Sequence, residues 1–63
     1  MSGEVRYGTP MRYKTVHFSD YDVAKNFYEK AKRFATNHNL NWTIALFRED
    51  GWLVMSEHIM IGD

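Results

Sequence analysis

Residues 43–55 read TIALFREDGWLVM, two apolar runs on either side of Glu49-Asp50-Gly51. An Asp-Gly pair between apolar runs is among the strongest short-range signals for a β-hairpin. We therefore predict one strand over residues 41–48 and a second over residues 52–59. The sequence leaves the register across the turn open by one residue, so which of Trp52 and Leu53 joins which face stays open.

Both strands of this hairpin carry large apolar side chains on both faces. A strand with one face in water alternates apolar and polar residues, whereas a strand covered on both faces is a continuous apolar run. In the first strand, Trp42, Ile44 and Leu46 fall on one face. Ala45 and Phe47 fall on the other. The pattern therefore predicts that something covers each face of the hairpin.

One amphipathic helix precedes the hairpin. Its predicted start is Ser19-Asp20-Tyr21-Asp22, with Ser19 as the residue that caps the first turn. The apolar residues that follow fall on one stripe at helical spacing, and they are Val23, Ala24, Phe27, Ala31, Phe34 and Ala35. We expect the helix to end near Asn37-His38-Asn39, because an asparagine tolerates the left-handed cap conformation.

The residues before the helix predict one strand and allow a second. Residues 12–18 (RYKTVHF) are rich in β-branched and aromatic side chains. A short strand over residues 4–7, turned back by Gly8-Thr9-Pro10-Met11, also fits. The expected fold is α+β: one small domain over residues 1–63, with an antiparallel sheet of three or four strands. The order is β-α-β-β, with or without the short first strand, and the helix packs on one face.

The composition excludes several classes of protein. The 63 residues include 8 Lys+Arg, 8 Asp+Glu and no cysteine, so the net charge is zero and neither disulfides nor cysteine-based zinc sites can stabilise the fold. The longest apolar runs have four residues, whereas a membrane span needs about 20, and the N-terminal residues do not resemble a signal peptide. We expect a cytoplasmic protein with no membrane partner.

No motif of an enzyme or a metal site is found. The spacing of His17, His38 and His58 matches no metal-ligand motif. Neither a Gly-x-Ser-x-Gly motif nor a Gly-rich phosphate loop occurs in the sequence. A chain this short also has few residues to spare for the walls of a substrate pocket of about 300 Å³. We therefore expect a protein that works by binding, without catalytic residues, metal or cofactor.

The leading hypothesis is a protein-binding module. A single helix covers one face of the sheet, so the other face is left apolar, and we expect on it the residues Tyr13, Ala45, Phe47, Trp52 and Val54. Either the first ten residues fold over this face or a second molecule covers it. The second molecule is favoured, and a copy of the same chain is the first candidate, since two-fold dimers are the commonest oligomers. By analogy of size with proteins of phages and mobile elements, such a homodimer would be a small regulator or inhibitor that occupies a surface on a larger protein.

The alternative hypothesis is binding of single-stranded RNA or DNA. Residues 1–36 hold seven Lys/Arg against four Asp/Glu, whereas residues 37–63 hold one against four. Cations interleaved with aromatic rings are typical of proteins that stack bases. The residues expected in such a site are Arg6, Tyr7, Arg12, Tyr13, Lys14, Lys32 and Arg33. The zero net charge of the chain argues against a dedicated nucleic-acid-binding protein.

Overall fold

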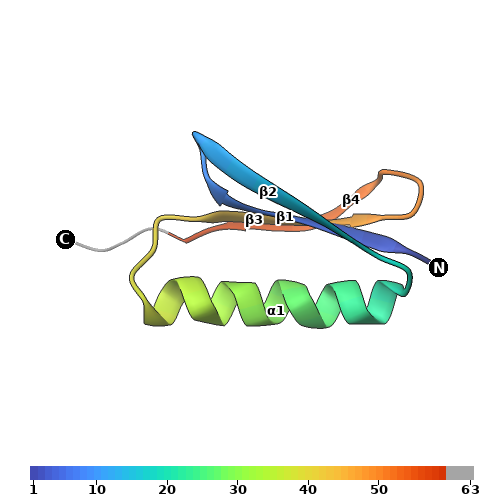
Figure 1. The fold of residues 1–63 in the computed structure, drawn as a ribbon, viewed down its shortest axis with the longest axis horizontal. Coiled ribbons are helices and arrows are strands. Elements are labelled where there is room, and N and C mark those ends of the chain that lie inside the picture. The colour runs from blue at the N-terminus through green and yellow to red at the C-terminus, as the bar shows by residue number, and fades with distance from the viewer. Residues whose placement is uncertain (60–63) are drawn as a thin grey trace.

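In a computed structural model, which describes residues 1–59, a four-stranded antiparallel sheet carries one helix against one of its faces (Figure 1). The elements, in chain order, are β1 (Gly3–Thr9), β2 (Arg12–Phe18), α1 (Tyr21–Asn37), β3 (Thr43–Arg48) and β4 (Leu53–His58). The strand order across the sheet is β2-β1-β3-β4. The predicted α+β fold is confirmed, and the optional first strand is present and longer than the predicted residues 4–7.

The N-terminal strand β1 lies in the middle of the sheet. It pairs with β2 on one side and with β3 on the other, so that Val5 faces Val16 in one pairing and Leu46 in the other. The first ten residues are therefore part of the sheet and do not fold over its helix-free face. Within residues 1–59 that face has no cover.

The ends of α1 follow the expected signals with one correction. The residue that caps the helix is Asp20, whose Oδ1 accepts a hydrogen bond from the Asp22 N–H at 2.8 Å. The predicted cap at Ser19 is wrong by one position. At the other end, His38 donates its N–H to the Phe34 carbonyl at 3.0 Å, and Asn39 has the expected left-handed φ of 54°.

The core lies between α1 and the sheet. Its buried residues are Val5, Ala24, Tyr28, Ala31, Ala35, Ile44 and Leu46. The Tyr28 side chain is only 1% exposed, and its burial, together with the nearby charges of Glu57 and Glu29, raises its pKa above the ordinary 10.0. The face of β3 that carries Ile44 and Leu46 is the covered one, as expected.

The buried stripe of α1 contains three predicted residues, Ala24, Ala31 and Ala35, and one that was not predicted, Tyr28. Ala24, Tyr28, Ala31 and Ala35, spaced i, i+4, i+7 and i+11, face the sheet, while Val23 and Phe34 are each 48% exposed. The reason is close packing. A Cβ built on Gly3 would lie 2.7 Å from the Ala24 Cβ, so the helix and β1 approach nearer than larger side chains allow.

The β3–β4 hairpin closes at Gly51, which has a φ of 85°. Phe47 pairs with Leu53, and Leu46 pairs with Met55. The pairing shifts between Leu46 and Phe47, as in a β-bulge, and Val54 packs against the core. The open question of register is thus answered: Leu53, and not Trp52, shares a face with Phe47.

The helix α1 has 17 residues. No helix in the part of the chain that the structure describes combines the length and the apolar character needed to cross a membrane.

Candidate functional site

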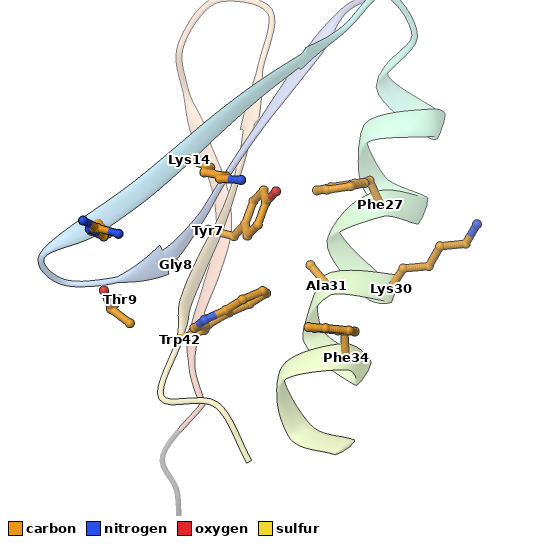
Figure 2. Close-up of a pocket in the computed structure, with 10 residues that line it drawn as sticks. Tyr7, Gly8, Thr9, Lys14, Phe27, Lys30, Ala31, Phe34 and Trp42 are labelled. Atoms are coloured by element: carbon orange, nitrogen blue, oxygen red, sulfur yellow. The ribbon is translucent and has the colours of Figure 1, made fainter. Parts of the chain in front are cut away.

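A cleft of about 610 Å³ opens between α1 and the hairpin formed by β1 and β2. We call it the aromatic cleft, and its lining residues are Tyr7, Gly8, Thr9, Arg12, Lys14, Phe27, Lys30, Ala31, Phe34 and Trp42. Figure 2 shows Tyr7 and Trp42 on the sheet side, opposite Phe27 and Phe34 on the helix side.

The sizes of side chains along the helix explain why the cleft forms at this end of the molecule. Near its start α1 lies close to β1, because Gly3 and Ala24 meet there. Further along, the rings of Tyr7 and Phe27 stand between the sheet and the helix (Figure 2). The β1–β2 hairpin rises away from α1 there (Figure 1). Gly8 has a φ of 137°, which other residues rarely adopt. A Cβ at this position would also collide with the Arg12 carbonyl oxygen.

The four rings of the aromatic cleft form a connected wall. The Tyr7 ring centroid lies 5.5 Å from that of Phe27 and 5.3 Å from that of Trp42, and Phe34 lies 5.6 Å from Trp42. These distances and the tilted or edge-on geometry are those of favourable aromatic pairs. Phe34 is 48% exposed, and the other three rings are half-buried. The wall is therefore held in place by its own contacts and still offers ring surface to a ligand.

The aromatic cleft carries positive charge and no carboxylate. Arg12 and Lys14 come from β2, and Lys30 comes from α1. Figure 2 shows the Lys14 ammonium group directed toward Tyr7, while Lys30 extends outward from the rim. None of these three cations has an ion-pair partner among residues 1–59. The Lys and Arg ion pairs found in that range are Arg6–Glu4, Lys32–Glu57 and Arg48–Asp50.

A second candidate surface is the helix-free face of the sheet. It holds a hollow of about 360 Å³ lined by Arg6, Tyr13, Thr15, Thr43, Ala45 and Phe47. Arg6 places its Cζ 4.6 Å from the Phe47 ring centroid and donates from its Nε to Glu4 at 2.8 Å.

The helix-free face is more polar than the sequence predicts. By the strand register, Glu4 pairs with His17 and with Phe47, and Thr43 pairs with His58, so all of these side chains share the face. Thr43 Oγ1 lies 2.8 Å from His58 Nδ1, within hydrogen-bond distance. The expectation of two apolar faces is therefore corrected: the outward face mixes rings, hydroxyls and the contacts of Glu4 with Arg6 and His17.

The residues predicted for a partner interface are only partly brought together. Tyr13, Ala45 and Phe47 lie around the same hollow on the helix-free face. Val54 instead packs against the core because of the irregular pairing in β4. Trp52 is in the turn before β4 and is 69% exposed.

The residues predicted for nucleic-acid binding are divided between the two faces. Tyr7, Arg12 and Lys14 meet in the aromatic cleft. Arg6 and Tyr13 lie on the opposite face, since successive residues of a strand point to opposite sides. The two helix cations of that set do not line the cleft: Lys32 pairs with Glu57 at 3.2 Å, and Arg33 is exposed on α1.

Sequence reasoning missed the two rings that α1 contributes to the cleft, because it assigned Phe27 and Phe34 to the core stripe. Phe27, Lys30 and Phe34 fall at i, i+3 and i+7, which places them on one side of the helix. That spacing could have indicated a binding surface. A lysine that shares one side of a helix with two aromatic rings is not expected on a side that packs against a core. Trp42 carried no such signal, since it belongs to the connection between α1 and β3.

Compared with known protein families, curated proteins and solved structures, the chain matches none. Within residues 1–59, His, Cys, Asp and Glu side chains form no group of three or more that could hold a metal ion.

Proposed function

We propose that this protein is a non-catalytic binding module that holds a short segment of single-stranded RNA or DNA in the aromatic cleft. The observation that carries the proposal is that four rings and three cations, with no carboxylate, line one cleft. Rings provide stacking surfaces for bases, and cations neutralise the phosphates between them.

The size of the cleft supports a short footprint. About 610 Å³ lies within the range of about 300–1,000 Å³ that small-molecule sites occupy, so the ligand is one or two nucleotides of a longer strand. A footprint this short requires positive charge only at the cleft. The zero net charge of the chain is then compatible with binding, and the proposed place of action is the cytoplasm.

A protein partner with acidic and aromatic side chains is the rival occupant. The arrangement favours nucleic acid because the cations stand on two elements, Arg12 and Lys14 on β2 and Lys30 on α1, with the rings between them. A nucleotide strand alternates phosphates and planar bases in the same way. A competition experiment between an oligonucleotide and an acidic, aromatic peptide distinguishes the two occupants. If the peptide displaces the oligonucleotide only weakly, nucleic acid is the preferred ligand; if the peptide binds more tightly, the protein partner is preferred.

The salt dependence of binding tests the proposal. Single strands lose affinity with a log–log slope of about −0.7 for each phosphate neutralised, so three cations predict a slope of about −2. The measurement is fluorescence anisotropy of a labelled oligo-U and oligo-dT from low to moderate salt. Lys14→Gln is expected to flatten the slope by about 0.7.

Lys25→Gln is the matched control, because it removes the same charge from an exposed position of α1 outside the cleft. It should leave the slope unchanged. The proposal fails if no oligonucleotide binds at low salt, or if the two lysine variants change the slope equally.

A further inference from the structure

We infer that the helix-free face of the sheet binds a second copy of this chain, as a two-fold dimer in which each Tyr13 ring enters the hollow of the other copy. This inference does not depend on the ligand of the aromatic cleft, which opens on the other side of the sheet.

The shape of the face fits a copy of itself. The hollow is lined by the small side chains of Thr15, Thr43 and Ala45, by Arg6 and Phe47, and by Tyr13, which has 56% of its surface exposed. The hollow measures about 360 Å³ and is open to solvent, so an aromatic ring of a second copy can reach it. The Tyr13 side chain and the hollow lie next to each other on the same face. A two-fold axis near them therefore lets the Tyr13 ring of each copy enter the hollow of the other.

The charge of the face also fits a copy. By the strand register, its formally charged residues are Arg6 and Glu4, and these bind each other at 2.8 Å. The face is thus neutral as a whole and does not repel its own copy, whereas the aromatic cleft carries three cations on the other side. A polyanion is therefore expected to choose the cleft and to leave this face free.

The area available predicts a weak dimer. Strands spaced about 4.8 Å apart with about 3.3 Å per residue make a four-stranded face of roughly 20 Å by 20 Å. Two such faces bury about 800 Å² in total, below the about 1,200–2,000 Å² of stable complexes. The dimer should accordingly form and dissociate as concentration changes. It would hold two aromatic clefts facing outward and so strengthen binding to long strands.

Sedimentation velocity over a wide concentration range tests the inference. The mass is expected to rise from the 7.5 kDa monomer toward twice that value as concentration increases. Tyr13→Ser should raise the dissociation constant about tenfold or more, as expected for an aromatic ring that inserts into a hollow of its partner. Tyr13→Phe keeps the ring and should dimerise as the parent chain does. Phe34→Ser, on the cleft side, should also leave the dimer unchanged.

Thr15→Arg provides a second probe that does not depend on Tyr13, because it places a large charged side chain in the lining of the hollow. Circular dichroism verifies that each variant is folded. The inference is overturned by a monomer at every concentration, by a dimer that neither Tyr13→Ser nor Thr15→Arg weakens, or by a dimer that Phe34→Ser disrupts. The affinity of each variant for a short oligonucleotide is measured as well. A variant that loses the dimer but keeps this affinity shows that the dimer and the proposed nucleic-acid binding are separate properties.

Discussion

A chain with Phe34→Ser binds single-stranded RNA or DNA about 10- to 100-fold more weakly than the parent, since stacking contributes about 1–3 kcal/mol per base. Phe34 is the most exposed ring of the aromatic cleft and lies against Trp42 at 5.6 Å between ring centroids. Because Phe34 is outside the buried core, the variant should remain folded. Anisotropy titrations at low salt measure the loss.

Val23→Ser is the matched control for this experiment. Val23 is on the same helix and has the same exposed fraction, 48%, but it does not line the cleft. Its replacement should leave the affinity within about twofold of the parent, as is usual for surface changes within about 0.5 kcal/mol. Equal losses in the two variants, or full affinity in Phe34→Ser, would contradict the assignment of the cleft.

Gly8→Ala is expected to have the largest effect on stability. Its backbone has a φ of 137°, and an added Cβ would collide with the Arg12 carbonyl oxygen, which is part of the hairpin and cannot move away alone. Strained backbone of this kind costs about 1–3 kcal/mol before any clash is counted. A chain of 63 residues has an unfolding free energy of only about 3–9 kcal/mol. Urea titration should therefore show a large fall in the unfolding midpoint.

Gly51→Ala separates strain from clash. Gly51 also has a positive φ, 85°, yet an added Cβ there meets nothing within 4 Å. The expected loss is the left-handed backbone cost alone, about 1–2 kcal/mol. Equal losses of stability in the two alanine variants would show that the clash with the Arg12 carbonyl oxygen adds nothing at Gly8. The close packing of the β1–β2 hairpin would then not be what shapes the cleft.

The elements that sequence predicted correctly are those with local signals. Asp50-Gly51 predicts the β3–β4 hairpin, and the acidic start and the helical spacing of apolar residues predict α1. The central position of β1 has no local signal. It depends on pairing Val5 with Leu46, which are far apart in the chain, and residues 3–9 contain two glycines that lower strand propensity.

The burial on α1 was misjudged for a physical reason. The predicted stripe combines Ala24, Ala31 and Ala35, which are buried, with Val23 and Phe34, which are each 48% exposed. Close contact at Gly3 instead favours the alanine stripe, and only a paired β1 makes that contact possible. The aromatic cleft is a product of this packing. Its residues come from β1, β2, α1 and the connection before β3, so no single stretch of sequence contains it.

The most direct test follows the two tryptophan side chains by NMR while an unlabelled oligonucleotide is added. Trp42 lines the cleft, whereas Trp52 lies in the β3–β4 turn at the other end of the molecule (Figure 1). The account predicts that the indole N–H signal of Trp42 shifts in a saturable way and that the Trp52 signal stays in place. A Trp42 signal that does not move, or a shift confined to Trp52 and the helix-free face, would contradict it.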